Sequence, residues 1–219
     1  MKREALKTLL EKFGQEYSET LGIKLETASD GEVFKWFLAS LLFGAPITEA
    51  SVIKTYRCFL KHRALSPERI LKIGWDDLVR ILDEGSYTRY DFKTADKLLL
   101  VMGNLEKDYD GRLNLLHGKA LDSRDLERRL KQLGKGVGDV TVSIFLRDLR
   151  GIWKKADPKP TPLVILAATN LGIIKRQQPE KILEKLKKFW NRNQLEGFTF
   201  VNFETALLRL GKEQRKKKS

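Results

Sequence analysis

The sequence predicts an all-α protein. In most segments of the 219 residues, apolar residues recur at intervals of three and four, which is the spacing of one face of a helix. No stretch alternates apolar and polar residues convincingly, so β-strands are not expected. A glycine-rich turn at residues 134–138 joins two of the helical patterns directly, which indicates a tight helical hairpin.

The first part of the chain contains a series of helical patterns with clear start signals. The pattern over residues 1–20 is amphipathic, and its charged residues are expected to face water. Ser29 and Glu32 have the spacing of a capping box, while Thr48 and Ser66 are typical N-cap residues for the next two helices. The helix after Ser29 is apolar nearly all round and is therefore expected at the centre of a helical domain.

Helical patterns continue on both sides of the glycine turn. They cover residues 92–102, 126–133, 142–149, 163–171, 182–190 and 203–210. Pro158, Pro160 and Pro162 exclude a helix in the loop before Pro162. Residues 212–219 are basic and carry no apolar side chain, which predicts a disordered tail that adds charge.

The charge balance of the chain favours a polyanionic partner. Lys and Arg number 42 against 29 Asp and Glu, which gives a formal net charge of +13. Nucleic acid is the first candidate and an anionic membrane surface is the second. No apolar run approaches the roughly 18 residues of a spanning helix, and the N-terminal residues do not resemble a signal sequence. We expect a cytoplasmic, nucleoid-associated protein without a membrane partner.

Metal and redox chemistry are not expected from the residue counts. Cys58 is the only cysteine, so the chain has no internal disulfide and no set of thiolates for zinc or for an iron–sulfur cluster. The two histidines, His62 and His117, lie in unrelated contexts. We therefore expect no metal site and no cofactor, and we expect a monomer.

The glycine turn has the properties of an anion site. Gly134, Gly136 and Gly138 permit positive φ and a close approach by another backbone, and the amides at the start of the next helix are unpaired donors. An ordinary glycine-capped connection has the same pattern, so the basic neighbours decide in favour of nucleic acid. The residues expected to contact DNA are Lys131, Lys135, Gly136, Val137, Gly138, Asp139, Val140 and Thr141.

Residues 133–142, LGKGVGDVTV, resemble the hairpin of the helix-hairpin-helix (HhH-GPD) superfamily of DNA glycosylases, the group of endonuclease III and the 3-methyladenine glycosylases. The family form Leu-x-Gly-Val-Gly-x-x-Thr-Ala is matched with one extra residue before Gly136. In that family an essential aspartate follows in a loop, and Asp157 lies 21 residues after Gly136, close to the family interval. With weaker matches upstream, the resemblance covers about residues 30–172.

The resemblance implies a two-lobed glycosylase-like fold and DNA base-excision repair. It places a barrel-like bundle at residues 24–130, a second lobe at residues 1–23 and 131–211, and double-stranded DNA between them. Asp157 is then the carboxylate that stabilises the oxocarbenium-like transition state when the N-glycosidic bond of a damaged or mismatched base is hydrolysed. Family members that also cut the strand carry a lysine in the slot of Val140, so AP-lyase activity is not expected.

Two questions about the chemistry stay open at this point. Counting back without a gap from Leu171 and Gly172 puts Thr161, not Asp157, in the place of the aspartate, and threonine would leave a non-catalytic helix-hairpin-helix DNA-binding protein. A lysine of the same loop also has the chemistry to replace the missing lyase lysine. The candidates for that role are Lys154, Lys155 and Lys159.

Residues that flip or hold a base are expected in three places. Tyr87, in a polar loop, is a candidate wedge for the duplex, because the reactive bond is inaccessible in stacked DNA. The loop with Ala45, Pro46 and Ile47 corresponds to a family loop that fills the gap left by the flipped base, although its proline also fits plain helix punctuation. Trp36 and Trp153 are candidates for stacking in a base pocket, although Trp36 also fits the core. The sequence does not indicate which lesion is excised.

Overall fold

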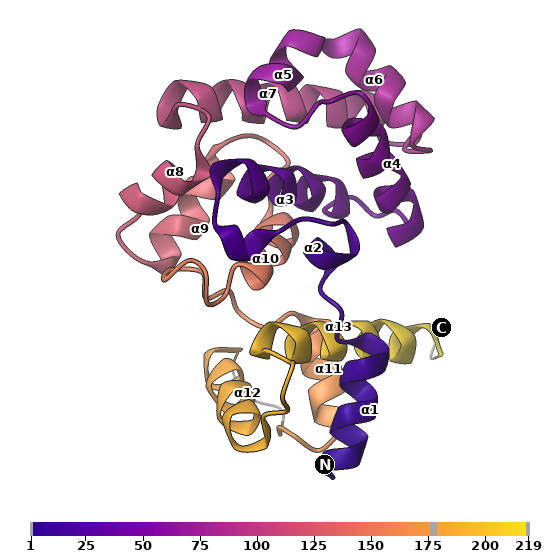
Figure 1. Ribbon diagram of the computed structural model, residues 1–219, viewed down its shortest axis with the longest axis vertical. Helices are drawn as coiled ribbons and strands as arrows, with labels where there is room; N and C mark the ends of the chain where they lie inside the picture. The colour runs from indigo at the N-terminus through magenta and orange to yellow at the C-terminus, as the bar shows by residue number, and fades with distance from the viewer. Residues whose placement is uncertain (1, 176–178, 218–219) are drawn as a thin grey trace. The chain divides into compact units, whose positions relative to one another are not determined.

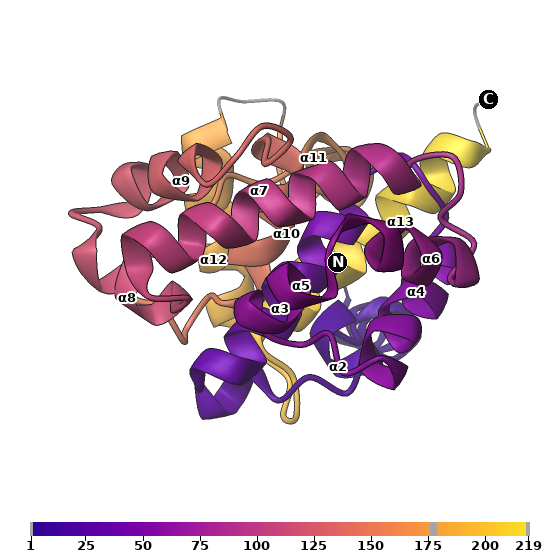
Figure 2. The same cartoon turned by 90° about the horizontal axis from the view of Figure 1, so that it is seen from above.

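The computed structural model describes residues 2–175 and 179–217, and in this part of the chain it contains helices and no strands, as predicted (Figure 1). The α-helices are α1 (Arg3–Phe13), α2 (Tyr17–Thr20), α3 (Asp30–Phe43), α4 (Glu49–Lys61), α5 (Pro67–Ile73), α6 (Trp75–Glu84), α7 (Asp91–Tyr109), α8 (Leu113–Lys119), α9 (Ser123–Gln132), α10 (Asp139–Asp148), α11 (Pro162–Asn170), α12 (Pro179–Asn193) and α13 (Phe200–Lys216). The longest described helix is α7, and α5 and α6 pack against it (Figure 2).

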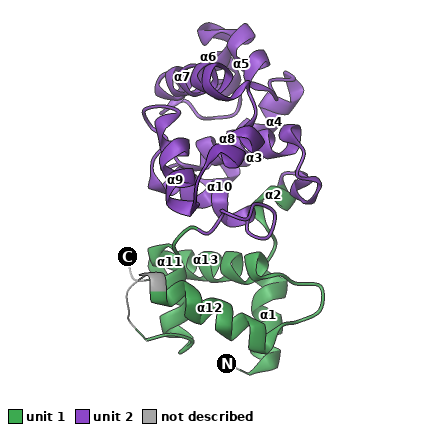
Figure 3. Cartoon of the chain, turned by 90° about the vertical axis from the view of Figure 1, so that its left-hand side faces the viewer, with its two compact units in different colours: residues 1–20, 158–219 green, residues 21–157 purple. Residues whose placement is uncertain are grey.

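The chain divides into two compact units, shown in different colours in Figure 3. The central unit consists of residues 21–157 and contains α3 to α10. The terminal unit combines residues 1–20 with residues 158–219 and contains α1, α2 and α11 to α13. Both ends of the chain therefore contribute to one unit.

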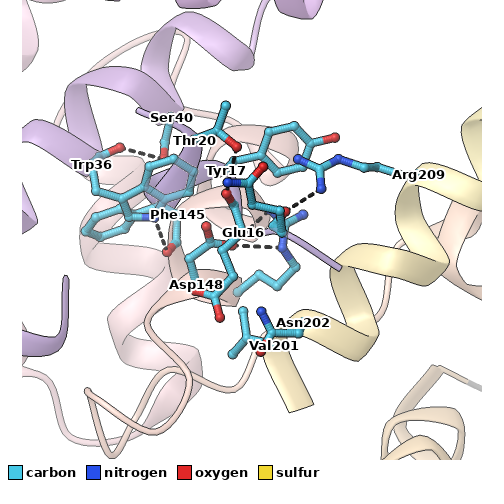
Figure 4. Close-up of polar contacts among 12 residues, drawn as sticks. Glu16, Tyr17, Thr20, Trp36, Ser40, Phe145, Asp148, Val201, Asn202 and Arg209 are labelled. Carbon is cyan, nitrogen blue, oxygen red and sulfur yellow. Dashed lines mark hydrogen bonds and ion pairs between the residues drawn. The ribbon is translucent and has the colours of Figure 1, made fainter. Parts of the chain in front are cut away.

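The boundary after the helical bundle differs from the expected one, because residues 131–157 belong to the central unit. The reason is the packing of α10 on α3. The Trp36 indole nitrogen donates a hydrogen bond of 3.0 Å to the Phe145 carbonyl oxygen (Figure 4), and the Phe37 and Phe145 rings meet edge to face at 5.0 Å. Contacts between residues more than 100 positions apart thus join the hairpin to the bundle.

The helix starts follow their local signals. The side chains of Ser29, Thr48 and Ser66 each accept a hydrogen bond from a backbone amide in the first turn, which confirms them as N-caps. Glu32 does not complete the expected capping box, because its carboxylate accepts from the Lys24 amide at 2.8 Å. α3 is buried on nearly all sides and packs against α4, α8 and α10, so its expected central place in a helical domain is confirmed.

The terminal unit is built around α13. A side chain at Gly211 would meet the Leu163 backbone of α11 at 2.2 Å, so the absence of a side chain allows the two helices to approach closely. On another side, the Phe189 and Trp190 rings of α12 stack on Phe203 at 5.6 and 5.5 Å. These contacts place α11 and α12 on the same central helix of the unit.

The expected disordered tail is wrong for residues 212–216, which form the last turns of α13. Lys212 lies 3.1 Å from the Tyr17 hydroxyl and over the ring of Tyr17, and Arg209 of the same helix also covers that ring (Figure 4 shows Arg209 and Tyr17). These cation–π contacts to α2 stabilise the helical conformation of the C-terminal part of α13. Residues 218 and 219 lie outside the described residues.

Candidate nucleic-acid interface

The hairpin between α9 and α10 turns at a residue whose backbone conformation favours glycine. Gly136 has φ +95°, in the left-handed region, and the Val137 amide closes the turn on the Gly134 carbonyl at 3.1 Å. A side chain at Gly136 would also lie 3.0 Å from the Lys97 side chain. The sequence prediction of a tight glycine hairpin is confirmed here.

The start of α10 presents its backbone donors to solvent. Gly138 is the N-cap and has no side chain to accept from the amides of the first turn. Gly136, Gly138, Asp139 and Val140 are exposed, and Val140 keeps 62% of its surface. The positive end of the helix dipole and the uncapped amides together form a site for an anion such as phosphate.

One acidic side chain lies at this anion site. The carboxylate of Asp139, in the first turn of α10, forms an ion pair with the Lys131 ammonium of α9. A phosphate that binds the α10 amides therefore meets a carboxylate whose charge is partly offset by Lys131. Lys135, at the turn itself, is exposed and contributes a second positive charge.

Two of the expected DNA-contacting side chains are buried instead. Val137 and Thr141 expose 4% and 2% of their surface, so their side chains point into the protein and not to solvent. The Thr141 hydroxyl fills the space that a side chain at Gly44 would occupy, at 2.1 Å. Gly44 begins the loop of residues 44–47, in which Pro46 is exposed and Ala45 and Ile47 are half-buried. The predicted gap-filling loop therefore adjoins the start of α10.

One face of α7 supports the hairpin. The Asn104 amide nitrogen donates to the Leu133 carbonyl at 2.8 Å, Val101 lies against Gly134, and the Lys97 stem lies under the turn. The Lys97 ammonium donates to the Leu41 carbonyl at 2.8 Å, and burial lowers the pKa of Lys97 to about 8. These residues were not predicted from the sequence, although the spacing of four and then three places them on one helix face.

Tyr87 is not an exposed wedge, because 1% of its surface is accessible. Its hydroxyl donates to the Leu42 carbonyl at 2.7 Å, and burial raises the pKa of Tyr87. Together with Lys97, it donates to two carbonyl groups in the last turn of α3, of which the Leu42 carbonyl also accepts from the Ala45 amide at 3.3 Å. Tyr87 therefore positions the loop that follows α3 instead of entering DNA.

Trp36 and Trp153 are also buried, with 0% and 3% of their surface accessible. Trp36 belongs to the core between α3 and α10, as its helical spacing allowed. Trp153 stacks on His117 at 4.5 Å, and its indole nitrogen donates to the Asn114 side chain at 2.8 Å. The expected base pocket is therefore not formed by the faces of these two rings. Instead, Trp153 fixes the loop after α10.

That loop ends at Asp157. The Trp153 amide bonds to the Leu149 carbonyl and the Ala156 amide bonds to the Trp153 carbonyl, both at 2.9 Å, so the segment is held by its own turns. The Asp157 carboxylate is 41% exposed and pairs with the guanidinium of Arg150, which is 5% exposed. Asp157 is the only acid in residues 149–161. The loop thus presents one oriented and accessible carboxylate.

Thr161 begins the next helix in the terminal unit. Its hydroxyl accepts from the Val164 amide as the N-cap of α11, and Leu171 and Gly172 follow the end of that helix. Thr161 therefore lies where the gapless count places the aspartate, directly before a helix that ends in Leu-Gly. Of the three loop lysines, Lys155 donates a hydrogen bond of 2.9 Å from its ammonium to the His117 carbonyl, while Lys154 and Lys159 are exposed.

Comparison with protein-family models and with curated sequences finds no match. Among solved structures, the chain is similar to the 3-methyladenine DNA glycosylase MagIII of H. pylori, in a crystal structure with 1,N6-ethenoadenine bound. The TM-score is 0.57, the sequences are 16% identical, and the likeness covers 99% of this chain and 98% of that chain. The predicted fold is thereby confirmed: the chain has the all-α fold of a helix-hairpin-helix DNA glycosylase.

Proposed function

We propose that this protein is a base-excision repair glycosylase that hydrolyses the N-glycosidic bond of a damaged or mismatched base in double-stranded DNA. The observation that carries the proposal is the uncapped, exposed start of α10 at a glycine hairpin, on a fold shared with a DNA glycosylase. Phosphate is the anion that such a site binds most often. Gly136, Gly138 and the α10 amides would hold one phosphate of the strand.

Asp157 is the proposed catalytic carboxylate. Cleavage of the N-glycosidic bond builds positive charge on the deoxyribose, and a fixed carboxylate stabilises that charge and orients the attacking water. Arg150 restricts the orientation of the carboxylate through the ion pair, and Trp153 anchors the loop that carries it. Arg150 and Trp153 are thus positioning residues in this proposal.

The reaction would stop at base release. Val140 occupies the slot of the lyase lysine and cannot form a Schiff base with the sugar. Borohydride reduction of a reaction mixture with damaged DNA should then trap no covalent protein–DNA adduct. A trapped adduct that disappears in Lys154→Gln or Lys159→Gln would assign the lyase role to that lysine instead.

The partner and setting follow from the same proposal. The protein would act as a monomer on nucleoid DNA, without an iron–sulfur cluster. None of the helices in the described parts of the chain is long and apolar enough to cross a membrane.

The decisive experiment uses duplexes with uracil, a thymine mismatch, 8-oxoguanine, hypoxanthine and alkylated purines, each incubated with wild type and with Asp157→Asn. Base release by wild type that is lost in the variant supports the assignment.

A specific observation favours a second candidate, a non-catalytic DNA-binding protein. Thr161 caps α11 directly before the helix that ends in Leu-Gly, and a hydroxyl there cannot replace a carboxylate in charge stabilisation. Under this alternative, wild type binds duplex DNA and releases no base from the panel. Thr161→Asp should then create activity, whereas under the first proposal it leaves the activity dependent on Asp157.

A further inference from the structure

The excess positive charge is concentrated in the unit that does not carry the hairpin. Residues 1–20 and 158–219 hold 18 Lys and Arg against 9 Asp and Glu, which is +9 of the net +13. The central unit, with 24 against 20, has a net charge of only +4. Most of the attraction toward a polyanion therefore originates outside the hairpin unit.

Part of this charge forms a stripe along α12. The stripe consists of Lys181, Lys185, Lys188 and Arg192, whose spacing of four, three and four places them on one helix face. All four side chains are exposed. The opposite face of α12 is buried in the terminal unit through Ile182, Leu183, Leu186 and Trp190. The orientation of α12 in its own unit therefore directs the stripe to solvent.

The stripe is not neutralised by neighbouring acids in the described part of the chain. None of its four members forms an ion pair among the described residues. Of the α12 side chains that are described, Glu184 is the one exposed acid, at the border of the stripe. Four unpaired cations at close spacing repel one another, and a bound polyanion would relieve that repulsion.

We propose that the α12 stripe is a second DNA-contacting surface, which grips backbone phosphates apart from the one at the hairpin. From Lys181 to Arg192 the stripe extends about 16 Å along the helix, and one DNA strand presents a phosphate about every 3.4 Å of its axis. Three of the four cations are lysines, which bind phosphate as point charges and do not read base edges. This surface rests on the DNA binding in the proposed function and not on catalysis.

An anionic membrane fits the stripe less well than DNA. A helix that binds at a membrane surface inserts exposed apolar side chains beside its cations. The apolar side of α12 is buried, and the exposed large apolar side chains of the described residues all belong to the central unit. The stripe thus offers charge without an inserting face.

The test compares two charge-matched variants of the full chain. In the stripe variant, Lys181, Lys185, Lys188 and Arg192 are changed to Gln; in the control, Lys2, Arg3, Lys7 and Lys12 of the same unit are changed to Gln. Each variant loses four positive charges. The Kd for an undamaged 20-bp duplex is measured by fluorescence anisotropy at several salt concentrations, and circular dichroism melting checks the fold of each variant.

We expect the stripe variant to bind at least tenfold more weakly near 0.1 M salt. Its salt slope should fall by up to about 3.6, since each of four phosphate contacts contributes about 0.9. The control should keep most of the wild-type slope. Glu184→Gln should bind more tightly than wild type, which a folding defect does not explain. Equal losses in the stripe variant and the control, or an unchanged slope in the stripe variant, overturn the proposal.

Two further outcomes separate this proposal from the proposed function. Wild-type binding and base release, with no effect of the stripe changes on binding, refute the stripe and leave the glycosylase intact. Binding of wild type to anionic phospholipid vesicles but not to DNA refutes both. Tighter stripe-dependent binding to single-stranded RNA than to the duplex also overturns the assignment of DNA as the partner.

Discussion

Lys97 is a buried ammonium under the hairpin, and its replacement by methionine tests how the turn is supported. Burial lowers the pKa of Lys97 from 10.5 to about 8, while its ammonium bonds to the Leu41 carbonyl. This lowering of the pKa corresponds to about 3 kcal/mol of differential stability between the two protonation states. In the unfolded chain Lys97 recovers its ordinary pKa, so folding and protonation are linked.

The sign of this linkage is fixed. Between pH 8 and 10.5 the unfolded chain binds more protons than the folded chain, so the free energy of unfolding rises with pH. The stabilisation gained in this range is lost as the pH falls back through 8. Lys97→Met removes the titrating group. The free energy of unfolding of wild type minus that of Lys97→Met should therefore increase by about 2 to 3 kcal/mol from pH 7 to pH 10.

Urea unfolding at pH 7, 8, 9 and 10, followed by circular dichroism on both proteins, measures this difference. Subtraction of the Lys97→Met values removes the contributions of other titrating groups that the two proteins share. A difference that stays constant across this pH range would refute the assignment of a lowered pKa to Lys97. A difference that decreases with pH would contradict the sign of the argument.

Three further substitutions test the hairpin and its support. Asp139→Asn should tighten duplex binding several-fold, since it removes the carboxylate at the anion site and frees Lys131; weaker binding in an anisotropy titration would contradict this role. Gly136→Ala should cost about 1 to 3 kcal/mol in urea unfolding because of its positive φ and the nearby Lys97 stem, and an unchanged midpoint would count against the strained turn. Tyr87→Phe should cost about 1 kcal/mol by removing a short hydrogen bond to the Leu42 carbonyl, which keeps its longer bond from the Ala45 amide, and an unchanged urea midpoint would contradict a stabilising role of the hydroxyl.

The elements with local signals were predictable from the sequence. N-caps such as Thr48 and Ser66 act within four residues, and the glycine turn with its two flanking helices is specified within about twenty. The all-α class follows from helical periodicity repeated along the chain. The hairpin and the start of α10 are predictable for the same reason, because their glycines and the flanking helical patterns are adjacent in the sequence.

Features set by distant contacts were not predictable in this way. Tyr87 lies in a polar stretch that resembles an exposed loop, but it is buried and its hydroxyl donates to the Leu42 carbonyl, 45 residues away. The last turns of α13 appear as a charged tail in the sequence, but Lys212 meets Tyr17 across 195 positions. The hairpin belongs to the central unit because Trp36 reaches Phe145. No local pattern contains these pairings.

In the proposed reaction, a single carboxylate in the loop after α10, that of Asp157, drives the loss of a base. Single-turnover release of free base from the damaged duplexes, measured with wild type and Asp157→Asn at equal duplex occupancy, tests it most directly. We predict release by wild type and a loss of at least a hundredfold in the variant, with duplex affinity retained. Equal rates in the two proteins, or no release by wild type from any duplex that it binds, would contradict the claim.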